Sequence, residues 1–296
     1  MTTLPAQAQT NVYSSPAGVR LMECRNGVRA PRGNDRKGNN VNIMSTIASL
    51  VPDKVFVAAI ARAHRKFEPE LDLIVASVPT RGTAVDVGVW YGPWTYWLSR
   101  RCEQVVDFEP NPDLAAVLDR TVRRNVRVEH LAASDAEGTA TLTLPAGGRG
   151  TEGRASLEGL QDGERTVEVK TVRLDDMGLT DVVLLKIDVE GHEFATITGA
   201  EQLLAEQHPV LVVELEDRHG GIAPSVDLLA SWGYAGKVLV EKRWVPLTEF
   251  DLPRHQAEYH AQPRRAGGYL SMSVRKQEPY INNVVFTHPE CTWDVR

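Results

Sequence analysis

Two glycines and an acidic residue in the first half of the sequence are spaced as in a turn that binds a nucleoside. In VDVGVWYGPWT, Gly88 lets the backbone approach a ligand closely, and Gly92 stands before Pro93 at an expected helix start. Glu109 follows Gly88 by 21 residues, which is about the spacing at which an acidic side chain accepts hydrogen bonds from both ribose hydroxyls. This spacing predicts a nucleoside ligand.

The turn itself distinguishes between two kinds of nucleoside. Its pattern is D-x-G-x-x-x-G, from Asp86 to Gly92, and it differs from the G-x-G-x-x-G pattern of dinucleotide-binding turns. A pyrophosphate requires backbone amides without a nearby carboxylate, whereas Asp86 suits a ligand with positive charge. The pattern therefore favours S-adenosylmethionine, which carries an ammonium group and a sulfonium.

A second group of polar residues, KIDVEGHE (186–193), follows four apolar residues at the end of an expected strand. An unpaired acid at Asp188 would be costly there, which indicates a functional role. Strand alternation predicts Asp188 and Glu190 on the same side, whereas Glu193 is expected to stabilise a helix N-terminus.

Methyl transfer to a hydroxyl requires alignment of the nucleophile with the methyl group and gains from a nearby base. The candidate bases are His192, Asp188 and His219. A metal site of Asp188, Glu214 and His219 has no motif spacing behind it, so no metal is predicted. The other histidines are expected to be structural: His64, His130, His208, His255, His260 and His288.

Strand patterns alternate with helical patterns from residue 82 onward. This alternation predicts one doubly wound, Rossmann-like α/β domain with helices on both faces of a mostly parallel sheet. Strands are expected at 83–89, 102–110, 126–134, 181–191, 208–216, 236–241 and 281–288. Helices are expected at 93–102, 111–125, 192–207 and 225–234. Ligands bind at the carboxyl edge of such a sheet, where both polar groups are expected to lie.

Three further segments complete the expected organisation of the chain. Residues 1–43 show no periodicity and predict a disordered leader, 44–81 a helical N-terminal cap, and 82–296 the α/β domain. Residues 136–175 are expected to form an antiparallel or looped excursion. The polar insertion 242–280 either caps the acceptor site or is a solvated loop.

Charge and composition exclude several classes of protein. Residues 1–43 carry a net charge of +4 and the remainder −10, and an acidic body disfavours a nucleic-acid partner. No run approaches the roughly 18 apolar residues of a membrane span. The three cysteines are far apart and form no CxxC pair, which excludes a disulfide scaffold or a zinc ribbon. We expect a cytoplasmic protein whose oligomeric state the sequence leaves open.

Four segments resemble the motifs of the FkbM family of S-adenosylmethionine-dependent methyltransferases: DVGVWYGPWT, VDFEPNP, LAASDAEGTATL and LLKIDVEGHE. The resemblance covers roughly residues 80–216, in the family's order and spacing. It implies a seven-stranded class I sheet, mostly parallel, with the last strand antiparallel.

The resemblance also implies roles for individual residues. Asp86, Gly88 and Gly92 would line the methionine end of the cofactor, Glu109 would hold the ribose with Asn111 nearby, and the Ser134-Asp135 turn would flank the adenine. The implied cofactor-binding set is Asp86, Gly88, Gly92, Thr95, Glu109, Asn111, Ser134 and Asp135. The expected catalytic set, which rests on the residues themselves, is Asp188, His192 and Glu190.

One departure from the family pattern is aromatic. Val89-Trp90-Tyr91 stands where members usually have a small residue and Asn. Trp94 and Trp97 are expected to pack against the sheet, whereas Trp90 and Tyr91 either pack or line the pocket.

The expected function is transfer of a methyl group from S-adenosylmethionine to a hydroxyl. The resemblance implies an acceptor that is a sugar, a glycolipid or a secondary metabolite, and N-methylation is also compatible with it. Two alternatives are an NAD-dependent oxidoreductase, which Glu109 would permit, and a nucleotide-binding protein without turnover.

Overall fold

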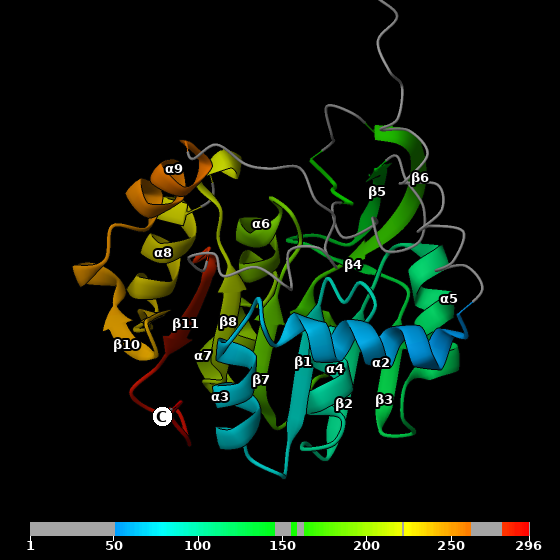
Figure 1. Ribbon diagram of the computed structural model, residues 1–296, viewed down its shortest axis with the longest axis horizontal. Helices are drawn as coiled ribbons and strands as arrows, with labels where there is room; N and C mark the ends of the chain where they lie inside the picture. The colour runs from blue at the N-terminus through cyan, green and yellow to red at the C-terminus, as the bar shows by residue number, and fades with distance from the viewer. Residues whose placement is uncertain (1–50, 146–154, 159–162, 221, 262–279, 296) are drawn as a thin grey trace, which may run out of the picture.

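The structure is a computed structural model that describes residues 51–145, 155–158, 163–220, 222–261 and 280–295 (Figure 1). The predicted disordered leader lies outside these residues. No helix within the described ranges is long and apolar enough to cross a membrane.

A central sheet of eight strands has the order β10-β9-β11-β8-β7-β1-β2-β3 (Figure 1). The five strands β8, β7, β1, β2 and β3 are parallel to one another. In contrast, β11 is antiparallel to both β8 and β9. The bounds are β1 Thr83–Val87, β2 Gln104–Phe108, β3 Val126–Glu129, β7 Val182–Ile187, β8 Val210–Glu214, β9 Ala235–Val240, β10 Arg243–Pro246 and β11 Asn283–Thr287. The predicted doubly wound, mostly parallel sheet with an antiparallel last strand is confirmed.

The sheet has one strand more than the seven predicted. β10 pairs with β9 through the two-residue turn Glu241-Lys242, in which both residues have positive φ angles, 46° and 67°. Such a turn matches the twist of a hairpin, but Asn and Gly usually occupy it. The turn residues therefore carry no hairpin signal, and this short strand was not expected within the polar insertion.

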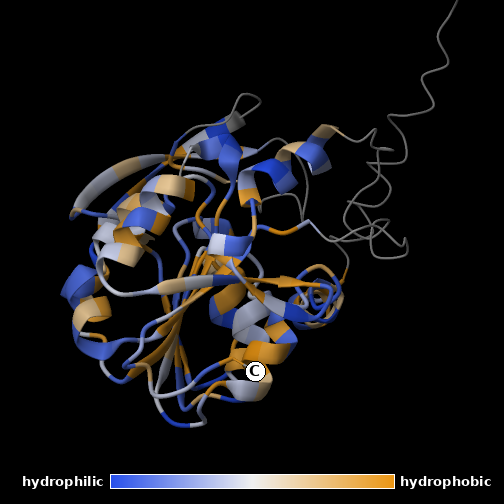
Figure 2. Ribbon diagram, turned by 90° about the vertical axis from the view of Figure 1, so that its left-hand side faces the viewer, coloured by the Kyte–Doolittle hydropathy of each residue, from blue (hydrophilic) through white to orange (hydrophobic). Residues whose placement is uncertain are grey.

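Helices cover both faces of the sheet, which explains why the strands are so apolar. On one face, Val85 and Val87 belong to a core cluster with residues of α6, α7 and α8. On the other, Ala84 clusters with residues of α3 and α4. Figure 2 shows the hydrophobic strands enclosed between helices. The helices are α2 Asp53–His64, α3 Glu70–Ser77, α4 Pro93–Leu98, α5 Pro112–Thr121, α6 Glu193–Thr198, α7 Glu201–Gln207, α8 Ile222–Ser231 and α9 Leu252–Ala261.

A second, three-stranded sheet follows the carboxyl end of β3. It consists of β4 Ala132–Ala133, β5 Gly138–Pro145 and β6 Gly163–Val172. β5 and β6 are antiparallel, which confirms an antiparallel excursion in this region. The single strand predicted at 126–134 is wrong, because its two halves pair in different sheets as β3 and β4.

The helix predicted at 192–207 is also divided, into α6 and α7, by Gly199 and Ala200. A Cβ atom at Gly199 would lie 1.9 Å from the carbonyl oxygen of Ser134. The helix break therefore lies where the chain passes directly against the end of β4.

Candidate active site

Three parallel strands bring the predicted polar residues to one edge of the sheet. Asp86 on β1 is in register with Asp107 on β2 and with Lys186 on β7. Gly88 follows β1 with a φ of +80°, and a Cβ atom there would lie 1.6 Å from the carbonyl oxygen of Asp188. Only glycine therefore allows the chain leaving β1 to pass so close to the chain leaving β7.

Glu109, the predicted ribose-binding residue, is held at the end of β2 by backbone amides. The Trp90 amide donates to its Oε2 at 2.8 Å, and the Asn111 amide donates to its Oε1 at 2.9 Å. Each oxygen retains a further lone pair, so the carboxylate can still accept two hydroxyl donors. Burial raises the pKa of Glu109 to about 7, although the two amides oppose the shift. Asn111 also caps α5 through its Oδ1, which accepts from the Asp113 amide.

Asp86 lies beneath the turn and is bound to α4. Its Oδ2 accepts hydrogen bonds from the amide (3.2 Å) and the hydroxyl (2.8 Å) of Thr95. The same hydroxyl lies 2.9 Å from Oδ1 of Asp107. One hydroxyl has one proton, so it satisfies both carboxyl groups only if one of them is protonated.

The surroundings of the two groups favour Asp107 as the one that holds this proton. It is fully buried, and its Oδ2 has no hydrogen-bond partner in the described part of the chain. Burial, and then repulsion from Asp86, raise the pKa of Asp107 well above its usual value. The pKa of Asp86 is raised, by burial, only to about 6 because the Lys186 charge opposes the shift. Sequence reasoning assigned no role to Asp107, although an acid within the apolar run VVDF is a signal.

Lys186 is the buried cation of the site. Its side chain is 1% exposed, and its Nζ lies 2.9 Å from Oδ2 of Asp188 and 5.8 Å from the ring centre of Trp94. Burial opposes the charged form, but Asp188 and Glu68 outweigh it and raise the pKa of Lys186 above its ordinary value. Lys186 therefore remains charged within the sheet.

Glu68 connects this cation to the N-terminal helices. It accepts a 2.6 Å hydrogen bond from Nε1 of Trp94 and lies 2.7 Å from Nε2 of His64. Burial raises the pKa of Glu68, but His64 and Lys186 outweigh burial and lower it to about 2. Neither Glu68 nor Lys186 was assigned a role from the sequence, because they lie 118 positions apart.

Asp188 and Glu190 have different partners. β7 ends at Ile187, so strand alternation does not govern the residues beyond it. Glu190 has a φ of +47°, and its Oε2 accepts a 2.9 Å hydrogen bond from Nη2 of Arg218, which also pairs with Glu216. Burial raises the pKa of Glu190 to about 7. Glu190 is thus turned toward the segment that follows β8.

Both ring nitrogens of His192 have partners. Its Nε2 lies 2.9 Å from Oγ of Ser134, and its Nδ1 lies 2.8 Å from Oε1 of Glu158. Ser134 is buried, and its hydroxyl is also 3.1 Å from the exposed Asp135. The predicted base and the predicted adenine-flanking turn are therefore in direct contact.

Gly191 brings His219 close to the same loop. A Cβ atom on Gly191 would lie 3.0 Å from Nδ1 of His219. The Nε2 of His219 lies 3.6 Å from Oε2 of Glu190. The three base candidates thus follow β7 and β8 at one edge of the sheet.

Most of the aromatic residues near the turn pack against helices. Trp94 is buried in the cluster that contains Ala84 of β1, as expected. Trp97 is partly buried against the same cluster, and its Nε1 donates to the Ala61 carbonyl oxygen of α2 at 3.0 Å. Tyr91 is 2% exposed and meets Phe56 of α2 edge to face at 5.0 Å. Trp90, at the turn, is half-buried with a φ of +55°.

The sheet order and the acids at its carboxyl edge define a Rossmann-like α/β protein of the methyltransferase type. A family model described as the methyltransferase FkbM domain matches residues 82–235, which is more than half of the chain. The chain therefore belongs to the FkbM methyltransferase family, as its motifs predict.

The solved structures that are similar to this chain include two of low sequence identity. One is the methyltransferase FkbM from Methylobacillus flagellatus KT, with 18% identity and a TM-score of 0.44 over 69% of this chain and 57% of that one. The other is the precorrin 8w decarboxylase of Methanobacterium thermoautotrophicum, with 10% identity and a TM-score of 0.40 over 74% of this chain and 89% of that one. The matched part thus spans little more than half of the first protein. No curated protein matches this chain.

Proposed function

We propose that this chain is an S-adenosylmethionine-dependent methyltransferase that methylates a hydroxyl group. The observation that carries the proposal is the position of Glu109. Its buried carboxylate is held by the Trp90 and Asn111 amides beside the turn that begins at Gly88. A carboxylate fixed in this way is suited to accept hydrogen bonds from the two ribose hydroxyls.

The charges of the site fit a cationic cofactor. Asp86 and Asp188 act on one buried cation, Lys186, and their repulsion adds to burial in raising the pKa of Glu109. A ligand with ammonium and sulfonium charges would relieve this repulsion, whereas a pyrophosphate would add to it. The family membership and the absence of G-x-G-x-x-G likewise disfavour the NAD-dependent alternative.

The cofactor-binding set remains the one that the motifs imply. Gly88 and Gly92 would shape the turn beside the cofactor, because a Cβ atom at Gly88 would meet the Asp188 carbonyl oxygen at 1.6 Å and one at Gly92 would lie 3.1 Å from Leu118. Ser134 and Asp135 would flank its adenine. Asp86 and Thr95 bind each other, so we propose that they support the turn and place negative charge beneath the methionine end.

When bound, S-adenosylmethionine supplies an electrophilic methyl group. We propose that Asp188, fixed by Lys186, orients the acceptor hydroxyl and that Glu190, fixed by Arg218, contributes a second polar contact. We propose His192 as the base that accepts the hydroxyl proton. It can do so only if its Nε2 is unprotonated and exchanges Ser134 for the acceptor.

We propose a sugar, glycolipid or secondary metabolite as the acceptor, in the cytoplasm, with the described part of the insertion 242–280 as a cap. Gln256 of α9 supports the cap, because its Oε1 accepts from the Asp217 amide at 2.8 Å and its Nε2 donates to the Leu215 carbonyl oxygen at 2.8 Å. These contacts hold α9 beside the residues that follow β8.

Calorimetry with S-adenosylhomocysteine and with NAD tests the cofactor. We expect binding of the first compound only, and binding of NAD alone would overturn the proposal. Incubation with methyl-labelled S-adenosylmethionine and a cell extract tests turnover. A labelled product whose methyl group is on oxygen is expected, and a methylamine product would contradict O-methylation.

A further inference from the structure

The strongest unassigned cluster lies at the edge of the sheet opposite the candidate active site. His208 lies two residues before the start of β8, and His288 directly follows β11. Because β8 and β11 are antiparallel, with Leu211 opposite Phe286, the start of one strand meets the end of the other. Glu290 lies two residues beyond His288. Two imidazoles and a carboxylate are thus brought together from segments 80 positions apart.

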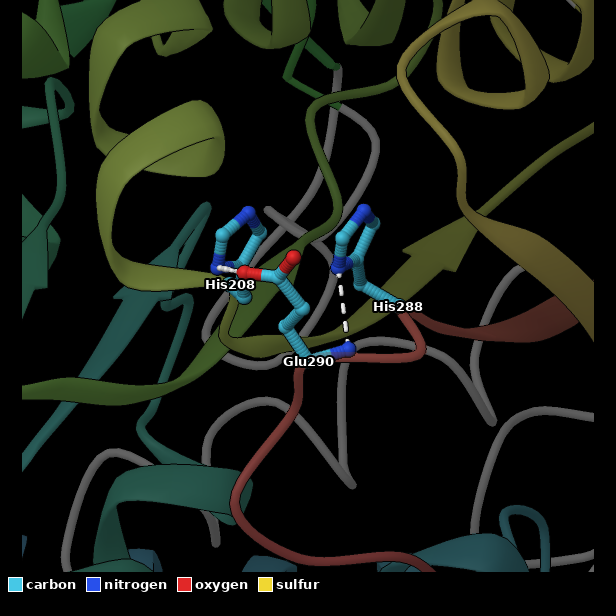
Figure 3. A group of neighbouring side chains, drawn as sticks. All are labelled: His208, His288 and Glu290. Carbon is cyan, nitrogen blue, oxygen red and sulfur yellow. Dashed lines mark hydrogen bonds and ion pairs between the residues drawn. The ribbon is translucent and has the colours of Figure 1, made fainter.

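The three side chains are close enough to share one ion. The rings of His208 and His288 are stacked, with centres 4.1 Å apart and an interplanar angle of 11°. The Nδ1 of His208 lies 3.6 Å from Oε2 of Glu290, and one ligand atom from each of the three residues lies within 4.8 Å of the other two. Figure 3 shows both rings beside the Glu290 side chain.

The surroundings hold the two rings in place. A Cβ atom on Gly233 would lie 2.8 Å from Nε2 of His288, so the absent side chain makes room for this ring. The Glu290 amide donates to Nδ1 of His288 at 3.1 Å, so the lone pair of that nitrogen accepts this hydrogen bond. His208 has a positive φ of 46° as the C-cap of α7.

The charges favour a cation at this place. His208 is the only ion-pair partner of Glu290 in the described part of the chain. The other comparable cluster, Glu190, Glu216 and His219, already contains the Arg218 charge.

We propose that His208, His288 and Glu290 bind one divalent transition-metal ion of the zinc type, with water completing the coordination. Two imidazole nitrogens and one carboxylate suit zinc better than magnesium or calcium. Zinc holds tetrahedral ligand atoms about 3.3 Å apart. Binding therefore draws the three atoms together by side-chain rotation, tilts the rings out of their stack and replaces the amide contact at His288.

The proposed role is structural. The segment after His288 returns to the sheet, where Nε1 of Trp293 donates to the Val183 carbonyl oxygen at 2.9 Å and Val295 is buried. A metal ion would fasten this segment to the chain that enters β8. Because the site lies away from the carboxyl edge, zinc is not required for S-adenosylhomocysteine binding, and this inference does not depend on the proposed function.

Thermal unfolding of the tag-free full chain, treated with EDTA and then titrated with ZnCl₂ or MgCl₂, tests the proposal. Zinc at about 100 times its dissociation constant should raise the Tm by about 5 °C, with one ion bound per chain by calorimetry. Magnesium should leave the Tm unchanged.

His208→Asn is the main variant, because Asn tolerates the left-handed backbone of a C-cap. It should retain the wild-type Tm in EDTA and lose the zinc response. Glu290→Gln changes an exposed side chain and should weaken zinc binding at least tenfold. His130→Asn is the control, because His130 forms an ion pair with Asp119 and with no other described residue, and it should respond as the wild type does. A wild-type chain without a zinc response, or an undiminished response in both His208→Asn and Glu290→Gln, would overturn the proposal.

Discussion

Lys186 and Asp188 form an ion pair of 2.9 Å in which the lysine side chain is almost completely buried and the aspartate is 28% exposed. The charge of Lys186 is therefore inside the protein, whereas its partner lies where the chain leaves β7. The negative charge of Glu68, in the turn between the N-terminal helices α2 and α3, also attracts Lys186 and raises its pKa. One cation thus connects the helices that precede the domain to the loop that we propose as catalytic.

Lys186→Met should strongly destabilise the protein, because it leaves several buried carboxylates without their cation. Removal of one partner from a buried ion pair costs about 3–5 kcal/mol, and urea unfolding at pH 7.5 measures this loss. The loss should shrink toward pH 5, where the carboxylates accept protons. Lys237→Met is the control, because Lys237 pairs with the exposed Asp294, and it should cost less than about 1 kcal/mol. Equal losses of unfolding free energy in both variants would show that the buried carboxylates do not depend on Lys186.

Glu109→Ala should weaken S-adenosylhomocysteine binding by roughly 1.5–3 kcal/mol, the range for hydrogen bonds to a charged group. Because the pKa of Glu109 is raised to about 7, wild-type affinity should fall as the pH drops through 7 and the carboxylate becomes protonated. Glu109→Gln should bind weakly at every pH. Calorimetry between pH 6 and 8 measures both effects, with Glu129→Ala as the control on β3. An unchanged affinity for Glu109→Ala would remove this residue from the site.

Asp188→Asn should reduce turnover strongly and leave most of the cofactor affinity intact. The amide oxygen can still accept from Lys186, so the fold should be retained, but the negative charge that orients the acceptor is lost. Initial rates at saturating cofactor and calorimetry with S-adenosylhomocysteine separate the two effects. A parallel loss of affinity and turnover would instead assign Asp188 to cofactor binding.

His192→Ala should lower turnover by about 10²–10⁴-fold, the usual share of general acid–base catalysis. The contact between His192 and Ser134 suggests a different role for His192, namely support of the Ser134-Asp135 turn. If His192 only holds the adenine-flanking turn, S-adenosylhomocysteine affinity should fall while turnover at saturating cofactor is preserved. His130→Ala is the control for loss of a histidine at the surface.

Glu70→Gln should stabilise the protein above pH 5. The Glu70 side chain is buried, its Oε2 has no hydrogen-bond partner among the described residues, and burial raises its pKa to about 8. The wild type therefore loses stability as the pH rises from about 4.5 to 8, because only the unfolded chain ionises freely. Gln has no such penalty, so its advantage should grow to roughly 1–3 kcal/mol by pH 8. Asp72→Asn, on the exposed side of α3, should show no such rise in urea unfolding across this pH range.

The architecture was predictable because its strands are buried on both faces and read as short apolar runs. The unexpected features arise from contacts between distant segments. Gly199 marks a helix break only because Ser134 lies against it. Glu241 and Lys242 form a hairpin turn that composition alone does not reveal.

The site was predictable to the extent that it depends on local spacing. Glu109 follows from its distance to Gly88, and the structure places the two at neighbouring strand ends. The partners that fix the charges were not predictable, because register and helix packing bring them together. Lys186 is the clearest example, since its partner Glu68 comes from the turn between α2 and α3.

The strands at the two ends of the main sheet affect how the protein behaves at high concentration. β3 and β10 are each four residues long. β3 carries Arg127 and Glu129, whereas β10 begins with Arg243 and ends with Pro246. Short strands with charges, or with a proline that lacks an amide proton, are poor templates for adding another chain. The hairpin that extends the sheet beyond seven strands therefore also protects it against edge-to-edge aggregation.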